Sequence, residues 1–141
     1  MTDPRIAAER VISSDLGEAR RLQDEIEEAL QAVRYGDRDI FSIKLALEEA
    51  LVNAIKHGNQ MDPDKSVHVA YTVTPDRFDI RITDQGPGFN PEDVPDPTLP
   101  ENLERCCGRG LLLIRKFMTD VSYEGNGNVL TMSRLRNGTP E

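Results

Sequence analysis

The stretch that decides the fold is residues 49–58, EALVNAIKHG. Apolar residues recur at threes and fours over positions 40–54, which predicts a helix over about residues 37–56. Glu49 and Asn53 are four residues apart, so we expect them on one face of that helix, beside its apolar stripe. An amide oxygen can bind a hydrated magnesium ion while a carboxylate accepts a proton or orients a water. The alternative is a helix flank that faces solvent.

A second segment, DQGPG at residues 84–88, follows an alternating apolar stretch that predicts a strand. Asp84 would then lie at the edge of a sheet, where a buried carboxylate can accept a hydrogen bond from an exocyclic amine such as that of adenine. Gly86 and Gly88 allow the backbone to pass close to a flat ring or to adopt a positive φ. The alternative is a tight turn that leaves a strand.

A third segment, CCGRG at residues 106–110, stands directly before a predicted helix. Gly108 and Gly110 leave backbone N–H groups open at the start of that helix, where the helix dipole favours an anion, so the segment suits a phosphate group. Arg105 and Arg109 could add charge-assisted hydrogen bonds. The alternative is a loop whose glycines provide flexibility only.

The rest of the chain gives the order β-α-α-β-β-loop-α-β-β. The expected strands are residues 5–13, 67–73, 78–83, 121–124 and 129–135; the expected helices run from a cap at Ser14 or Asp15 to 33, from a cap at Asp37 to 56, and over 109–119. Residues 74–77 and 125–128 join hairpins. Residues 84–108 are mostly irregular, with five prolines from position 87 to 100, as in a binding loop or lid. This segregation predicts an α+β, two-layer sandwich: a mostly antiparallel sheet with helices on one face.

Composition narrows the class of protein. The chain has 141 residues, the size of a single domain spanning 1–141, with a tail from 137 that we expect to be frayed. A net charge of −8 disfavours nucleic acid as a partner, although a local group of backbone N–H donors can still bind one nucleotide. No apolar run approaches the roughly 20 residues of a membrane span, and residues 1–10 contain no apolar h-region, so we do not expect a signal peptide. The adjacent Cys106 and Cys107 indicate reduced thiols in a cytoplasmic protein, and with two histidines a zinc site is not expected.

The three segments, in this order, resemble the boxes of the GHKL ATPases, the superfamily of gyrase, Hsp90, histidine kinases and MutL. Residues 49–58 resemble the N box, 84–89 the G1 box and 108–111 the G2 box. The bare domain size and the form Glu-Ala-x-x-Asn-Ala-x-x-His-Gly resemble the anti-sigma-factor serine/threonine kinases of the RsbW type. The resemblance runs from the first strand to about residue 136, and it implies the Bergerat ATP-binding fold.

The resemblance also implies roles for particular residues. Asn53 would ligate Mg²⁺, which bridges the phosphates of ATP, and Glu49 would be the general base that activates a serine hydroxyl of a partner protein. Asp84 would hold the adenine amine, while Gly86 and Gly88 would line the adenine pocket.

Other implied positions lie near the nucleotide, with Arg105 and Arg109 near its phosphates. Residues 90–107 would form the ATP lid, and the remaining nucleotide-binding residues would be His57, Gly58, Arg105, Gly108, Arg109 and Gly110. The sequence departs from the superfamily at Gly127-Asn128, where Gly-Thr is frequent and the threonine supports the adenine subsite; Asn128 stands in its place. Residues 104–108 also differ from the Ser-Gly that commonly precedes the G2 box.

Two functions fit these features. The first is a kinase that transfers the γ-phosphoryl group of ATP to an anti-sigma-antagonist protein and also captures a sigma factor, in a partner-switching system. The second is a non-catalytic module that uses ATP only to shape its lid and sequesters a regulator. The retained Glu49 favours the kinase, since a pure binder needs no base. Kinases that this chain resembles are often homodimers. A domain without a nucleotide would require three coincidental motifs.

Overall fold

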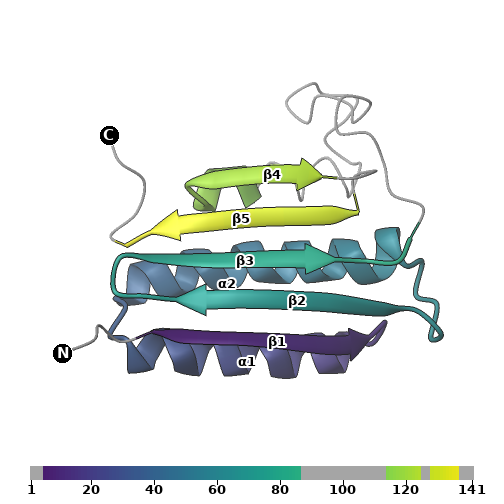
Figure 1. Cartoon of the computed structure of the whole chain (residues 1–141), viewed down its shortest axis with the longest axis horizontal. Coiled ribbons are helices and arrows are strands. Elements are labelled where there is room, and N and C mark those ends of the chain that lie inside the picture. Colours follow the sequence, from purple (N-terminus) through teal and green to yellow (C-terminus); the bar gives the residue numbers. More distant parts are fainter. Residues whose placement is uncertain (1–4, 87–113, 125–127, 137–141) are drawn as a thin grey trace.

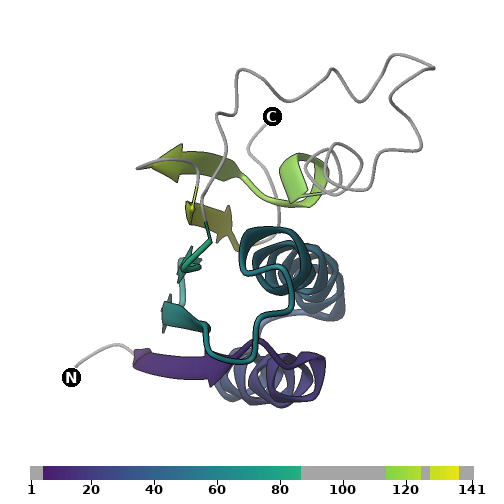
Figure 2. The ribbon, with the colours of Figure 1, turned by 90° about the vertical axis from the view of Figure 1, so that its right-hand side faces the viewer.

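The computed structural model describes residues 5–86, 114–124 and 128–136. These residues form two layers, with an antiparallel sheet on one side and two long helices packed against one of its faces (Figures 1 and 2). The elements are β1 (Ile6–Ser13), α1 (Leu16–Ala32), α2 (Asp37–Val52), the π-helix η1 (Asn53–Gly58), β2 (Ser66–Val73), β3 (Arg77–Thr83), β4 (Asp120–Glu124) and β5 (Val129–Leu135). The predicted α+β sandwich is confirmed.

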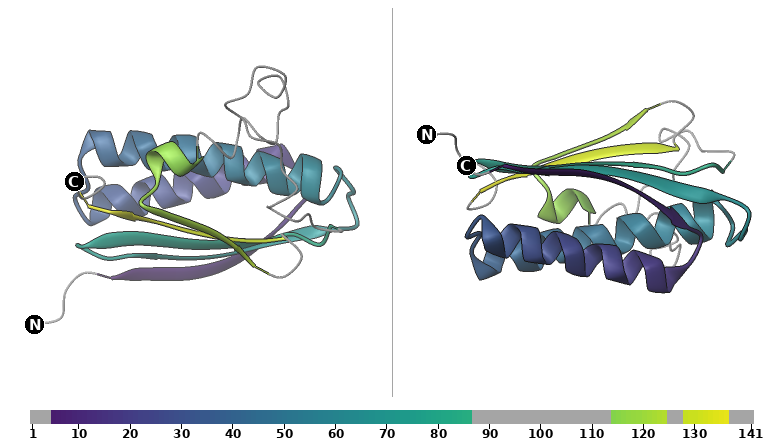
Figure 3. Two further views of the ribbon diagram at one scale, coloured as in Figure 1. Left: turned by 90° about the horizontal axis from the view of Figure 1, so that it is seen from above. Right: turned by 60° about the horizontal axis from the view of Figure 1, so that its bottom comes forward.

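The sheet has the strand order β1-β2-β3-β5-β4, and each neighbouring pair is antiparallel. The register sets Tyr71 of β2 opposite Ile80 of β3, and Ile80 opposite Met132 of β5, so apolar residues form continuous rows on the face toward the helices. Leu47 and Leu51 of α2 are fully buried against these rows. The core therefore lies between the sheet and the helices, as two further views show (Figure 3).

The two long helices begin differently. The Oδ1 atom of Asp15 accepts hydrogen bonds from the N–H groups of Gly17, at 2.6 Å, and Glu18, at 3.2 Å, which confirms Asp15 as the cap of α1. The prediction that Asp37 caps α2 is wrong, because Gly36 is the N-cap and makes no side-chain hydrogen bond. Asp37 is instead the first helical residue, where a carboxylate interacts favourably with the helix dipole.

The second helix changes its winding within residues 49–58. The α-helix ends at Val52, and residues Asn53–Gly58 form a π-helix rather than the continuous α-helix to about Lys56 that we predicted. The N–H of Asn59 donates to the carbonyl of Ala54, five residues earlier, at 2.8 Å. A single wide turn leaves little mark on apolar periodicity, so the sequence did not reveal it.

Three boundaries near the sheet also shift. Arg77, predicted as a turn residue, begins β3, and β4 begins one residue early at Asp120. The last helix, predicted to Thr119, ends at residue 117 in the described segment 114–117. There the N–H of Thr119 donates to the carbonyl of Ser133 in β5, at 2.8 Å, which draws the chain into the sheet. Nη1 of Arg134 donates to the carbonyl of Phe117, at 2.6 Å, and satisfies the end of the helix.

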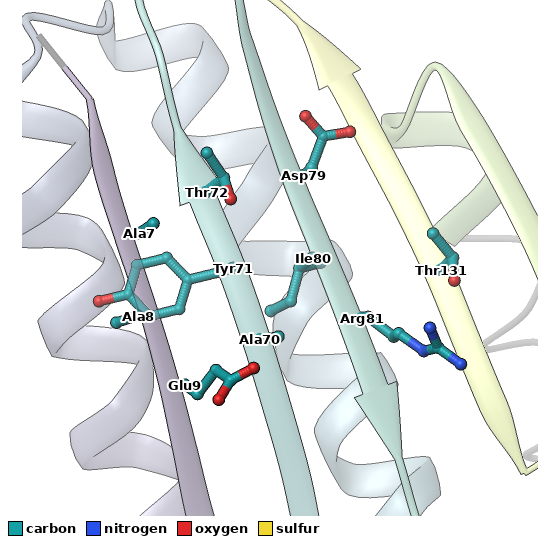
Figure 4. A pocket seen from close by; sticks show the side chains of 10 residues that line it. All are labelled: Ala7, Ala8, Glu9, Ala70, Tyr71, Thr72, Asp79, Ile80, Arg81 and Thr131. Atoms are coloured by element: carbon teal, nitrogen blue, oxygen red, sulfur yellow. The ribbon is translucent and has the colours of Figure 1, made fainter.

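The face of the sheet away from the helices carries a shallow depression of about 440 Å³ (Figure 4). Ala70, Thr72, Arg81 and Thr131 alternate with core residues along their strands, so their side chains point to this outer face. The lining contains none of the predicted site residues, and the depression is therefore not the candidate site. Among the described residues, no helix is both long and apolar enough to cross a membrane.

Candidate functional site

Glu49 in α2 and Asn53 at the start of η1 lie on one helix face, as predicted. The N–H of Asn53 still donates to the carbonyl of Glu49, so the α-helical spacing holds up to this residue and widens only beyond it. Both side chains are half-buried, whereas Ala46 and Ala50 beside them are buried in the core. Among the residues that the structure describes, neither Glu49 nor Asn53 has a side-chain hydrogen bond or ion pair. An acid and an amide are thus available at the border of the core.

The end of η1 meets the end of β3 at two glycines. A Cβ atom added at Gly58 would lie 2.4 Å from Cγ and 2.4 Å from Oδ2 of Asp84. A Cβ atom added at Gly86 would lie 1.6 Å from the carbonyl oxygen of Gly58. Neither distance is possible for a real side chain. At Gly86 the neighbour is backbone, so two backbone segments pass too close for any side chain there, whereas at Gly58 the space is taken by the carboxyl group of Asp84. We expected Gly86 to serve a ring or a positive φ; the neighbour that requires it is the backbone of Gly58.

Asp84 is held by the strand beside it. Its N–H donates to the carbonyl of Asn128, at 3.0 Å, and its carbonyl accepts from Nδ2 of Asn128, at 3.2 Å. Its Oδ1 accepts from the N–H of Gly86, at 2.9 Å. The structure therefore places Asn128 directly against Asp84, in the position where the superfamily often has threonine.

The carboxyl group of Asp84 is half-buried, and its surroundings alter its acidity. Burial raises the pKa of Asp84 above the usual range for an aspartate, while the N–H of Gly86 and the charge of Lys65 oppose that rise. Oδ1 is occupied by Gly86, and Oδ2 faces the Cα atom of Gly58. A partly desolvated carboxylate accepts a hydrogen bond more strongly than one in water, which suits recognition of an amine on a ligand.

Asn59, which directly follows Gly58, is a site residue that sequence reasoning missed. Its side chain is fully buried, and its Oδ1 accepts from the N–H of Gln85, at 2.7 Å. Its Nδ2 donates to Oγ of Ser14, at 3.1 Å, and to the carbonyl of Ser66, at 3.0 Å. The sequence showed only an asparagine that ends a helix. The available signal was its place directly after the His-Gly pair.

The remaining predicted residues divide into two groups. His57 lies in η1 with an exposed side chain, one residue before Gly58. The predicted lid over 90–107 lies outside the described residues, as do Gly88, Arg105, Gly108, Arg109 and Gly110. The structure thus brings together Gly58, Asp84, Gly86 and Asn128 where β3 ends and the neighbouring β5 begins, next to the helix that carries Glu49 and Asn53.

Comparison with known proteins places this geometry in a family. The histidine kinase-like ATPase domain family matches residues 12–134, and the chain belongs to that family. It is 30% identical to the serine-protein kinase RsbW of Listeria monocytogenes serotype 4a (strain HCC23) over 105 residues, which are 70% of this chain and 67% of that protein. It is also 30% identical to the serine-protein kinase RsbW of Bacillus licheniformis over 112 residues, 73% of this chain and 69% of that one. Within its family, the chain is of the RsbW type of serine-protein kinases.

A solved structure has the same fold. The crystal structure of the RsbU and RsbW domains of Rv1364c from Mycobacterium tuberculosis superposes with a TM-score of 0.65 at 17% identity. The match covers 95% of this chain and 34% of that longer one. The expected superfamily, the Bergerat-type fold and the class of protein serine/threonine kinases are confirmed at the level of the family.

Proposed function

We propose that this protein is an ATP-dependent serine/threonine kinase of the anti-sigma-factor type, which phosphorylates an anti-sigma-antagonist protein in the cytoplasm. The observation that carries the proposal is the meeting of Gly58, Asp84 and Gly86 at the end of the helix that bears Glu49 and Asn53. A half-buried carboxylate for a base amine therefore lies at the end of the helix that carries an acid and an amide suited to phosphate chemistry. The RsbW-type relatives support the same reaction.

Different residues would bind the base and the phosphates of the nucleotide. Asp84 accepts a hydrogen bond from the adenine amine, and Asn128 fixes the backbone on either side of that carboxyl group. The amide oxygen of Asn53 would hold Mg²⁺, which neutralises charge on the phosphates when it is bound. The donor set fits this ion, because an amide oxygen beside a carboxylate is a hard oxygen environment.

Glu49 is placed to act as the general base. A serine or threonine hydroxyl oxygen of the antagonist forms a bond to the γ-phosphorus of ATP, and the bond between that phosphorus and the β,γ-bridging oxygen breaks, releasing ADP. The hydroxyl proton passes to the carboxylate of Glu49. Most of the acceleration comes from positioning and charge neutralisation, to which a general base adds roughly 10²–10⁴-fold.

Calorimetry of ATP binding, with and without magnesium, tests the nucleotide site. We expect magnesium-dependent binding by the wild type and its loss in Asp84→Asn, because an amide is a weaker acceptor for the adenine amine. Asp79→Asn is the matched control, since it removes the same charge from β3, the strand directly before Asp84, at a residue that is paired with Arg77 on the outer face. Equal loss in both variants would refute the assignment of Asp84.

Transfer of radiolabelled γ-phosphate to purified anti-sigma-antagonist proteins tests the chemistry. Glu49→Gln should lower the transfer rate by at least about 10²-fold with little change in ATP affinity. Glu48→Gln is the control, because Glu48 is the neighbouring exposed carboxylate on the same helix. Unchanged transfer in Glu49→Gln would refute its role as base. ATP binding without transfer to any antagonist would favour the non-catalytic module that sequesters a regulator.

A further inference from the structure

The side chain of Asn59 joins segments from four parts of the chain. It follows the last turn of η1, and its three hydrogen bonds reach Ser14 between β1 and α1, Ser66 at the start of β2, and Gln85 after β3. It is fully buried, and Ser14 is buried as well. Burial of a primary amide is costly unless its donors and acceptor are all used, and here they are.

The partners fix the orientation of this amide. Ser66 offers a carbonyl oxygen and Gln85 offers an N–H, so only one assignment of oxygen and nitrogen avoids two donors, or two acceptors, facing each other. Ser14 Oγ accepts from the amide and itself donates to the carbonyl of Lys65, at 3.0 Å. The direction of each hydrogen bond in this network is therefore fixed, and the Oδ1 atom of Asn59 accepts from the backbone N–H of Gln85.

Gln85 lies between the two residues that form the nucleotide-facing turn. Its side chain is also held, because Oε1 accepts from the N–H of Ser66, at 2.7 Å. Asn128 restrains Asp84 from the β5 side, and Asn59 restrains the next peptide from the helix side. The Asp84 carboxyl group thus has little freedom to move relative to η1, although Asn59 does not touch it.

We propose that Asn59 is a positioning residue for recognition of the nucleotide base, which sets the Asp84 carboxylate against the end of the helix and so determines the preference for adenine. This role rests on the proposed function. The preference follows from chemistry: adenine presents an amine donor to Asp84, whereas guanine presents a carbonyl oxygen, which a carboxylate repels. If the turn is loosened, the hydrogen bond from the adenine amine to Asp84 should weaken, and the repulsion between Asp84 and the guanine carbonyl should decrease.

The test compares ATP and GTP binding by calorimetry in wild type, Asn59→Ala and Ser14→Ala, each held well below its thermal midpoint. Asn59→Ala should weaken ATP binding about tenfold, the scale of one charge-assisted hydrogen bond, with a change of less than about twofold for GTP. Ser14→Ala is the matched control, since it removes a buried member of the same network but keeps the contact from Asn59 to Gln85. It should leave the ratio of the two affinities within about twofold of the wild type.

The outcomes separate the two proposals. A folded wild type that binds neither nucleotide would overturn the proposed function and this role with it. Wild-type ATP binding with an unchanged ATP-to-GTP ratio in Asn59→Ala would overturn the role of Asn59 alone, as would an equal fall of the ratio in Ser14→Ala. If Asn59→Ala does not fold, hydrogen exchange of the wild type decides: the Gln85 amide should exchange slowly, and exchange at the rate of an unfolded peptide would refute the proposal.

Discussion

Replacing Gly86 with alanine perturbs a close approach of two backbone segments in the candidate site. The added Cβ would lie 1.6 Å from the carbonyl oxygen and 2.3 Å from the carbonyl carbon of Gly58, both of them backbone atoms that cannot rotate away. An ordinary contact begins near 3.4 Å, so the end of η1 and the turn after β3 would have to separate by about 1.8 Å. Such a shift would also stretch the hydrogen bond from Gln85 to Asn59, now 2.7 Å long.

We therefore expect Gly86→Ala to lower the free energy of unfolding by about 3 kcal/mol, the upper part of the range for overpacked cores. Urea unfolding followed by circular dichroism measures this change, and calorimetry should show weakened ATP binding because Asp84 moves with the turn. Gly36→Ala is the control: a Cβ there meets no atom within 4 Å, and its φ of −73° suits alanine. Its effect should stay within about 1 kcal/mol. Unchanged stability and ATP affinity in Gly86→Ala would refute the close packing of η1 on this turn.

Three further predictions concern titratable groups. Asp39 and Arg134 form a buried ion pair at 3.0 Å, so Asp39→Asn should cost about 3–5 kcal/mol of unfolding free energy, because it leaves the guanidinium buried without its charge partner. Burial raises the pKa of Tyr35 and Tyr71 to about 12, so two of the three tyrosines should ionise only near that pH in an absorbance titration. The contribution of these two neutral tyrosines to the free energy of unfolding should be fully present below about pH 10 and should be lost as the pH rises toward 12. Burial also raises the pKa of Asp84, so the contribution of its protonated carboxyl group to stability is present below the ordinary aspartate pKa and is lost as the pH rises through the folded pKa. Asp84→Asn should therefore be more stable than the wild type at neutral pH, and this advantage should shrink in acid.

Each of these has a control in the chain. Asp79→Asn breaks the exposed pair with Arg77 and should cost less than about 1 kcal/mol. Tyr71→Phe should remove one late-titrating group and leave the other, and a titration with all tyrosines ionising near pH 10 would contradict the burial argument. For Asp84→Asn, a stability difference from wild type that does not vary with pH would show that ionisation of this carboxyl group is not its cause.

Local patterns were enough to predict most elements. The alternation in β2 and β3 and the helical period in α1 and α2 are properties of a few neighbouring residues. These elements appear in the structure with small shifts at their ends, apart from the end of α2, where the α-helix stops at Val52. The cap at Asp15 was also local, since its side chain reaches only two and three residues along the chain. The π-helical turn of η1 was not predicted, because one extra residue per turn changes the apolar period too little over a short segment.

The contacts that build the core and the candidate site were not local. Asp39 and Arg134 are 95 residues apart, and neither sequence neighbourhood indicates a buried charge. Asn59 looked like a residue that ends a helix, and its burial depends on the packing of three other segments around it. Sequence spacing could place Glu49 and Asn53 on one face, but no spacing could show that Gly86 meets the backbone of Gly58.

The sequence by itself determined the kinds of elements, their order, and the side-chain chemistry of the residues that we propose for nucleotide binding, because hydrophobic period and residue type are properties of each segment alone. Only the tertiary structure decided which of those residues meet. The sheet must cover its apolar face with α2, and this packing brings the end of η1 onto the turn after β3, where the backbone of Gly58 leaves no room for a side chain at position 86 and where Asn59 can reach Gln85. Contacts of that kind arise from the burial of the whole core, and they therefore have no signature in any single stretch of the chain.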